Sequence, residues 1–327
     1  MRIDVFDGPM LDGCCPTSHW HQTSIATSRI SRVRQRRQWR QAARLHGDAS
    51  GFTCQAARAC RLYDLHDQTI PYQQAWDWQH RELQRILAEK ADDGQGSDAL
   101  FIMQHQPVYT LGTGSSEGHL LFDPTSSTIP LYRTERGGEV TYHGPGQLVI
   151  YPLLHLGAPK SQVPKDLHLY MRSLEEVVIR ALSEVSGLRG ERVEGLTGVW
   201  VGQHKLAAIG VRAKQWVTYH GLAVNICPDL RPFAAIVPCG ISDRPVGSVA
   251  QQLGRPHPRT LSVQIDEAGF PSESSGTEGG TLAMEDDEGN QLLQEYRYAL
   301  LEAFEAVFGL KLMLAGSMDL SLEPKHC

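Results

Sequence analysis

Residues 136–154 read R-G-G-E-V-T-Y-H-G-P-G-Q-L-V-I-Y-P-L-L. Two clusters of Gly and Pro bracket a polar, β-rich segment, so we expect the backbone to bend sharply at each cluster. Gly137 and Gly138 remove side chains where another group could approach the main chain. Residues 147–154 form an apolar run of strand length, which predicts a buried strand. The stretch therefore indicates either the wall of a pocket or a hairpin with a tight Gly-Pro-Gly corner.

The composition of the whole chain narrows the class of protein. A length of 327 residues suits one large domain or two small ones, and 41% hydrophobic residues are enough for a core. No run approaches the roughly 20 apolar residues that a membrane-spanning helix needs. The formal net charge is -6, although the first 60 residues hold nine Arg, no Lys and four Asp. The acidic remainder argues against nucleic acid as the main partner, because binding to phosphates requires clustered Lys and Arg.

The N-terminal stretch has the composition of an organelle transit peptide. Residues 13–46 contain no acidic residue, many Ser and Thr, and a dense series of Arg. This balance is typical of transit peptides, and the alternative is a basic tail that binds nucleic acid or a membrane surface. We therefore expect residues 1–55 to be a transit peptide, disordered in the folded protein.

The periodicity of apolar residues predicts an α+β fold. Helical spacing predicts helices over residues 71–90, 167–182 and 292–308. Strand-like runs cover residues 100–103, 131–133, 197–201, 205–213, 216–226 and 310–314. Helices and strands do not alternate regularly, which favours a mixed, largely antiparallel sheet with flanking helices.

The same pattern divides the chain into segments. We expect a catalytic domain over residues 56–264, then an acidic disordered insertion over residues 265–289, where Glu, Asp, Ser and Gly predominate. A C-terminal helix and tail over residues 290–327 should pack on the catalytic domain.

Two residues outside the opening stretch are candidates for a catalytic role. Cys239 lies in I-V-P-C-G-I, where Pro238 and Gly240 predict a corner that exposes the thiol beside apolar residues. Its reactivity depends on the thiolate, so a nearby cation is needed. Lys205 begins the apolar strand K-L-A-A-I-G-V. A lysine at the rim of an apolar pocket loses solvation, which favours the neutral amine and makes it a proton acceptor. Together they would form a Cys-Lys dyad.

Each of these residues also has a structural interpretation. The seven cysteines are odd in number, scattered and without a C-x-x-C pair, which suits a reducing compartment and fits neither a disulfide framework nor a zinc site. A lone Cys in a turn is often a small buried hydrophobe. Lys205 could be a solvated cap, His143 could bind the backbone of its own turn, and Cys227, before Pro228, resembles Cys239 locally with less apolar shielding.

Four motifs in unbroken order over residues 60–254 carry a resemblance to a known family. They are R-G-G-E-V-T-Y-H-G-P-G-Q-L, K-L-A-A-I-G-V, Y-H-G-L-A-V-N-I and I-V-P-C-G-I. The chain resembles the lipoyl(octanoyl) transferases, most of all those of plant and algal plastids. The resemblance implies the biotin/lipoate ligase-type α+β fold and an acyltransferase that needs no metal and no cofactor.

The resemblance also implies partners and site residues. The donor would be octanoyl-acyl carrier protein, and the acceptors would be lipoyl domains of 2-oxo acid dehydrogenase E2 subunits and the H protein of glycine cleavage, with neither nucleic acid nor membrane as partner. The location implied is the chloroplast, with the mitochondrion as the alternative. Cys239 would form an acyl thioester and Lys205 would activate its thiol. The substrate-contacting positions fall on Arg136, Gly137, Gly138, Glu139, Val140, Thr141, Tyr142, His143, Ala208, Ile209, Gly210, Gly221, Leu222 and Ala223.

The expected reaction is a two-step acyl transfer. Backbone N–H groups near Cys239 and Gly240, or along the Gly-rich stretch, would stabilise the oxyanion. His143 is expected to position substrate, with acid-base work as a lesser role. The alternatives are an ATP-dependent lipoate or octanoate ligase of the same fold, a non-catalytic binding module for carrier proteins or lipoyl domains, and a cysteine hydrolase that releases octanoate.

Overall fold

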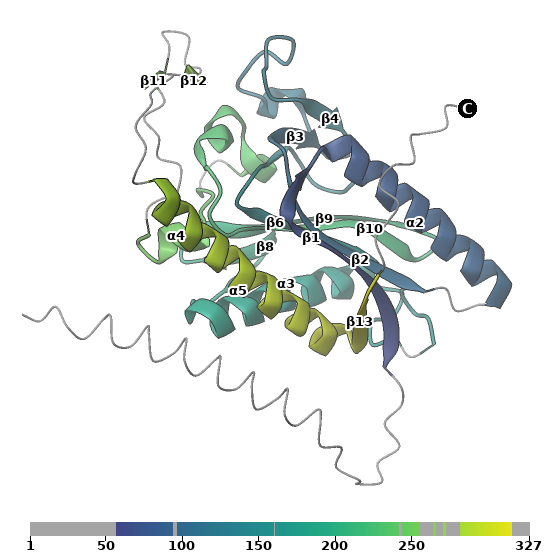
Figure 1. Ribbon diagram of the computed structural model, residues 1–327. Helices are drawn as coiled ribbons and strands as arrows, with labels where there is room; N and C mark the ends of the chain where they lie inside the picture. Colours follow the sequence, from purple (N-terminus) through teal and green to yellow (C-terminus); the bar gives the residue numbers. More distant parts are fainter. Residues whose placement is uncertain are drawn as a thin grey trace, which may run out of the picture. The chain divides into compact units, whose positions relative to one another are not determined.

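A mixed sheet of eight strands is the centre of the fold (Figure 1). The computed structural model describes residues 57–93, 97–159, 161–241, 244–255, 264–265, 271–272 and 282–315. The strand order is β13 (Leu310–Leu314), β1 (Arg58–Ile70), β2 (Asp98–His105), β6 (Gln147–Leu153), β10 (Val217–Asn225), β9 (His204–Lys214), β8 (Leu196–Val201) and β7 (Glu191–Val193). Strand β1 is parallel to both of its neighbours, whereas the other neighbouring strands pair antiparallel. The predicted mixed, largely antiparallel α+β fold is confirmed.

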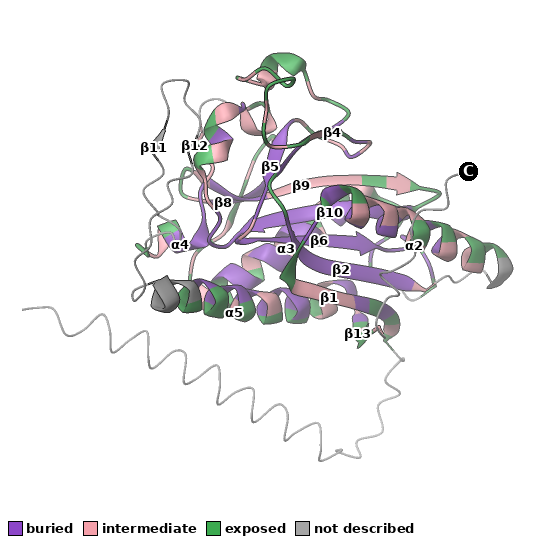
Figure 2. Ribbon diagram, turned by 45° about the horizontal axis from the view of Figure 1, so that its top comes forward, coloured by how far each residue is buried: buried purple, intermediate pink, exposed green. Residues whose placement is uncertain are grey.

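Helices cover both faces of this sheet (Figure 2). Helices α3 (Leu167–Ser186) and α5 (Leu282–Phe308) pack on one face, and α2 (Tyr72–Asp93) packs on the other. Helix α3 begins where the Asp166 side chain accepts hydrogen bonds from two backbone N–H groups, and it ends at Gly187 in the left-handed conformation. Strands β2, β6 and β10 are buried throughout, because both of their faces are covered.

A second, three-stranded sheet carries the opening stretch of the sequence analysis. Its order is β4 (Leu131–Arg133), β3 (Val108–Leu111) and β5 (Thr141–His143). Its apolar side chains form a separate cluster with Phe233 of η2 (Arg231–Ala235). The backbone N–H of Gly137 donates to the carbonyl of Val211 in β9 at 3.0 Å. The Gly-rich loop thus lies against the main sheet, and the pocket-wall interpretation of this stretch holds.

The element boundaries differ from the sequence expectation in two places. Residues Val108–Leu111 form strand β3, which the sequence analysis did not predict. Helix α5 begins at Leu282, so its first turns occupy part of the stretch 265–289 that we expected to be a disordered insertion. Our prediction was therefore wrong over residues 282–289.

The remaining described elements are small. They are η1 (Glu117–His119), η3 (Pro238–Gly240), α4 (Val249–Gln252) and the paired strands β11 (Gln264–Ile265) and β12 (Pro271–Ser272). The expected transit peptide, residues 266–270 and 273–281 of the expected insertion, and residues 316–327 lie outside the described residues. Among the residues that the structure describes, no helix is long and apolar enough to cross a membrane, and no group of His, Cys, Asp or Glu has metal-binding geometry.

Candidate active site

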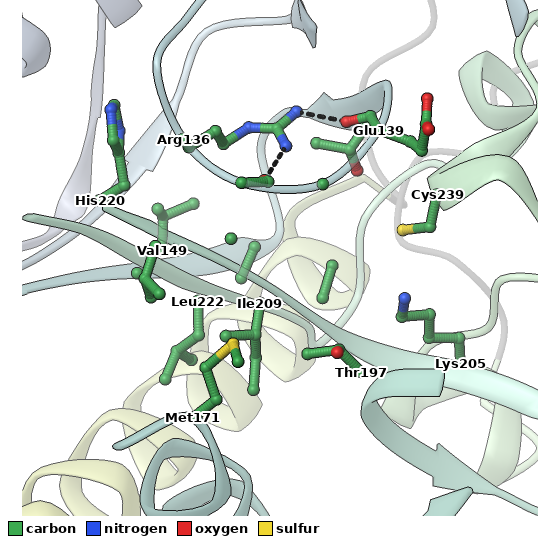
Figure 3. Close-up of a pocket in the computed structure, with 18 of the residues that line it drawn as sticks. Arg136, Glu139, Val149, Met171, Thr197, Lys205, Ile209, His220, Leu222 and Cys239 are labelled. Atoms are coloured by element: carbon green, nitrogen blue, oxygen red, sulfur yellow. Dashed lines mark hydrogen bonds between the residues drawn. The ribbon is translucent and has the colours of Figure 1, made fainter. Parts of the chain in front are cut away.

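A cavity of about 310 Å³ lies between the Gly-rich loop and the main sheet (Figure 3). This volume is at the lower end of the range for small-molecule sites. Fourteen of the sixteen residues singled out from the sequence line it, although they come from four separate stretches. They are Arg136, Gly137, Gly138, Glu139, Thr141, His143, Lys205, Ala208, Ile209, Gly210, Gly221, Leu222, Ala223 and Cys239.

Cys239 is held in an unusual backbone conformation at one end of this cavity. It is the middle residue of η3, half-buried, with a φ of 57° in the left-handed region. That region costs a residue with a side chain roughly 1–2 kcal/mol. The Cys239 N–H donates to the carbonyl of Val140 at 3.0 Å, which ties the turn to the Gly-rich stretch. Strain of this kind is found at functional sites, where the surrounding structure enforces it.

Lys205 reaches the same end of the cavity from β9. Figure 3 shows its amine and the Cys239 thiol converging there. Although Lys205 is only 6% exposed, its Nζ lies 5.6 Å from the centre of the Trp200 ring. Within the described part of the chain, no carboxylate forms an ion pair with it. The amine is thus withdrawn from water and free to bind another group in the cavity.

Arg136 fixes the shape of the Gly-rich loop. Its guanidinium donates to the carbonyl oxygens of Thr110, Gly137 and Glu139 at 2.7, 3.0 and 2.8 Å. Burial lowers the pKa of this side chain, whose charge is distributed over those carbonyl dipoles. Arg136 therefore lines the cavity as part of its frame, with most of its N–H groups bonded to Thr110 of β3 and to the loop.

Val140 and Tyr142 are the two predicted contact residues that do not line the cavity. Val140 contributes its carbonyl to Cys239, while its side chain is fully buried in the third apolar cluster. The Tyr142 ring packs edge-on against Phe233, with ring centres 5.4 Å apart. Side chains alternate along a strand, so these two point away from the cavity when Thr141 and His143 point into it.

The cavity reaches both faces of the main sheet. Val149, Tyr151 and Ala223 belong to the apolar cluster under α2, whereas Leu222 belongs to the cluster under α3 and α5. Figure 3 shows Met171 of α3 beside Leu222, away from Cys239. Gly210 and Gly221 pair across β9 and β10, and an added Cβ would lie 2.8 Å from the Gly137 carbonyl at the first and 2.1 Å from the Ile150 carbonyl at the second.

Sequence reasoning missed ten lining residues. They are Tyr72, Val149, Tyr151, Met171, Gly195, Leu196, Thr197, Val211, His220 and Ile241. The alternation of strand 147–154 places Val149 and Tyr151 on one face and would have selected them. Met171 belongs to an apolar helix face, and nothing in the sequence separates a core residue from a cavity residue there.

The buried histidines of the cavity differ in their partners. The Nδ1–H of His143 donates to the Gln147 side-chain oxygen at 2.7 Å, and burial lowers its pKa to about 3. His143 is therefore neutral near pH 7, which favours positioning over acid-base work. His220 is 1% exposed with a φ of 55°, and its ring nitrogens have no hydrogen-bond partner in the described part of the chain. Burial also lowers the pKa of His220, whose Nε2 lies 3.8 Å from Glu135.

Two of the proposed oxyanion donors are already engaged. The Cys239 N–H donates to Val140, and the Gly240 N–H donates to the Val237 carbonyl at 3.1 Å. Of the two sources of oxyanion donors suggested by the sequence, the Gly-rich stretch is therefore a better candidate than the N–H groups of Cys239 and Gly240.

The fold and site place the chain among the lipoyl protein ligase catalytic domains. Residues 73–265 match the family of the lipoyl protein ligase A/B catalytic domain, and the chain belongs to that family. A bi-partite lipoate protein ligase structure from Thermoplasma acidophilum has a TM-score of 0.51 at 16% identity, covering 80% of this chain and 89% of that one. At this identity the likeness shows the fold alone, and it confirms the predicted ligase-type architecture.

Several curated relatives are named octanoyltransferases. A chloroplastic octanoyltransferase of Arabidopsis thaliana is 55% identical over 192 residues, which cover 59% of this chain and 67% of the relative. An octanoyltransferase of the cyanobacterium Synechocystis is 54% identical over 195 residues, which cover 60% of this chain and 81% of the relative. The resemblance to lipoyl(octanoyl) transferases that the four motifs predicted is confirmed.

Proposed function

We propose that this protein transfers an octanoyl group from octanoyl-acyl carrier protein to a lysine of a lipoyl domain, through a thioester on Cys239. The observation that carries the proposal is that Cys239 and Lys205, from separate elements, meet at one end of a cavity whose other walls include Ile209, Leu222 and Met171. A nucleophile, a base and an apolar wall are the parts that acyl transfer requires. The octanoyltransferase relatives support the same reaction.

In the first step, Lys205 takes the proton of the Cys239 thiol. The thiolate Sγ then attacks the carbonyl carbon of the donor thioester, and the bond between that carbon and the carrier's sulfur breaks. The leaving carrier thiolate takes the proton from Lys205. In the second step, Lys205 accepts a proton from the acceptor lysine, whose amine attacks the acyl-enzyme and forms the amide. The Cys239 thiolate is the leaving group, and it takes the proton back from Lys205 to restore the starting enzyme.

The proposal includes partners and a location. The donor is an acyl carrier protein, and the acceptors are lipoyl domains of E2 subunits and the H protein of glycine cleavage, as the resemblance implies. A chloroplast location is supported by the chloroplastic relative and by the acid-poor, Arg-rich residues 13–46. The mitochondrion is the alternative location. A fusion of residues 1–55 to a fluorescent protein would distinguish the two organelles.

The first test is the formation of the acyl-enzyme. Intact-protein mass spectrometry after incubation with octanoyl-acyl carrier protein, without ATP, should show one octanoyl adduct that hydroxylamine removes. The chemistry requires no nucleotide, because the donor thioester is already activated. Adduct-free protein that modifies a lipoyl domain only with ATP and free octanoate would establish the ligase alternative instead. Free octanoate as the main product in the presence of a lipoyl domain would establish the hydrolase. Binding of the carrier protein or lipoyl domain without either reaction would establish the binding module.

Met171 should limit the length of the acyl chain. It lies on α3 beside Leu222 and away from Cys239, so the alkyl tail would point toward it. With Met171→Ala we expect kcat/KM for decanoyl relative to octanoyl to rise about tenfold, since each buried methylene contributes roughly 0.8 kcal/mol. Met171→Trp should favour hexanoyl. The matched control is Leu169→Ala, which changes an exposed residue of the same helix. An unchanged chain-length profile in both Met171 variants would exclude this path for the tail.

A further inference from the structure

Glu175 is a buried carboxylate outside the cavity whose partners connect it to the active site. It lies on α3 with 1% of its surface exposed. One oxygen accepts hydrogen bonds from Arg172 and Arg192 at 2.8 and 3.1 Å. The other accepts the backbone N–H of Gly198 in β8 at 3.0 Å. A buried charge is tolerated when it is paired and hydrogen-bonded, and here one of the bonds goes to a strand that borders the cavity.

The Gly198 hydrogen bond coincides with the place where β8 and β9 separate. Among the described strand pairs, the β8–β9 ladder ends at Val199 and Ala207, with an irregularity next to it. Beyond that pair, Leu196 and Thr197 on β8 and residues 208–211 on β9 line the cavity. Because the Gly198 N–H is bonded to Glu175, it is not used in pairing with β9. The carboxylate therefore bonds to β8 at the point where the β8–β9 pairing ends and the cavity begins.

Gly198 is also the residue that leaves space for Lys205. Its φ is 123°, a conformation that favours glycine. A Cβ at this position would lie 2.7 Å from Cε of Lys205 and 2.4 Å from the Ala207 carbonyl. The methylene chain of Lys205 thus passes directly over Gly198. A shift of Gly198 would therefore change the space available to the Lys205 side chain.

We propose that Glu175 is a positioning residue for Lys205, acting through Gly198; this rests on the proposed role of Lys205 as the base. The carboxylate on α3 fixes Gly198, and Gly198 in turn fixes the path of the lysine side chain. Glu175 itself touches neither substrate nor the reacting atoms.

The test measures the reactivity of the Cys239 thiol in the full chain without any acyl donor. Alkylation by iodoacetamide at pH 7 is followed by mass spectrometry of the peptide that contains Cys239. We expect Lys205→Ala to slow alkylation about tenfold, because the thiolate population falls when its base is lost. Glu175→Ala should slow it to a similar degree. The double variant Glu175→Ala/Lys205→Ala should be no slower than Lys205→Ala alone, since both changes remove the same interaction.

Two further variants separate positioning from general stability. Glu176→Gln is the matched control, because Glu176 is the next residue on α3 and also pairs with Arg192, at 2.8 Å, but makes no contact with Gly198 in the described structure. It should keep the wild-type alkylation rate. Glu175→Gln retains a carbonyl oxygen for the Gly198 N–H and should restore most of the reactivity lost in Glu175→Ala.

Several outcomes would overturn the inference. Wild-type reactivity in folded Glu175→Ala would do so, and so would equal slowing by this change in the presence and absence of Lys205. If Glu175→Ala does not fold, Gly198→Ala tests the same path, because its added methyl would meet both the Lys205 stem and the Ala207 carbonyl. Wild-type alkylation in that folded variant also contradicts the inference. A normal rate in Lys205→Ala would instead show that the base proposed for acyl transfer is wrong.

Discussion

Replacement of Cys239 by serine should abolish octanoyl transfer. We expect no hydroxylamine-labile adduct and a loss of at least about 10³-fold in kcat/KM, because a serine hydroxyl is far less acidic than a thiol and a lysine amine cannot deprotonate it efficiently. The change removes no packing volume of consequence and leaves the turn Pro238–Gly240 with its hydrogen bond to Val140. Intact-protein mass spectrometry and initial rates with a lipoyl-domain acceptor measure both effects.

Cys227 provides the matched control for this experiment. Cys227 precedes Pro228, and Cys239 follows Pro238, so the two cysteines resemble each other in sequence. In the fold, however, Cys227 is 6% exposed and lies outside the cavity. Burial raises its pKa to about 12, so its thiolate is scarce at neutral pH. Cys227→Ser should keep the adduct and the transfer rate of the folded enzyme. If the adduct persists in Cys239→Ser and disappears in Cys227→Ser, Cys227 is the nucleophile and the proposal is wrong.

The contrast between these two cysteines shows how far a site residue can be predicted from the sequence. The local pattern around Cys239 predicted an exposed corner, and the pattern around Cys227 predicted nearly the same. Only the tertiary structure separates them, since it places Val140 behind one and the core of α5 and the main sheet around the other. The motifs that carried the family resemblance favoured Cys239 over Cys227 before any geometry was available. Local physical arguments left both open.

The sheet illustrates the same limit at the level of the fold. Strand 147–154 and helices 167–182 and 292–308 were predictable because their apolar residues follow one period without interruption. Strand β3 was missed because Val108–Leu111 is short and runs into a Gly-rich turn. The first turns of α5 were missed because their acidic composition matches that of a linker. The hydrogen bond from Gly198 to Glu175, at the point where the β8–β9 pairing ends, joins two residues that are distant in sequence, and no local pattern predicts it.

Replacement of Lys205 by alanine should lower kcat for octanoyl transfer by about 10²–10³-fold, the range that a positioned general base contributes. The loss should affect both half-reactions, because the lysine accepts a proton from Cys239 in the first and from the acceptor amine in the second. Single-turnover acylation and deacylation with a lipoyl domain measure the two steps separately. Lys214→Ala is the matched control, since it removes an exposed lysine at the far end of the same strand.

Lys205→Arg then distinguishes proton transfer from simple charge. An arginine keeps a cation near Cys239 but stays protonated at all accessible pH values, so it cannot accept a proton. If Lys205 acts as the base, the Arg variant should be nearly as slow as the Ala variant, in acylation and in deacylation. If it only stabilises the thiolate by charge, the Arg variant should retain acylation. The buried position of Lys205 over Trp200, without an ion-pair partner among the described residues, leads us to expect the first result.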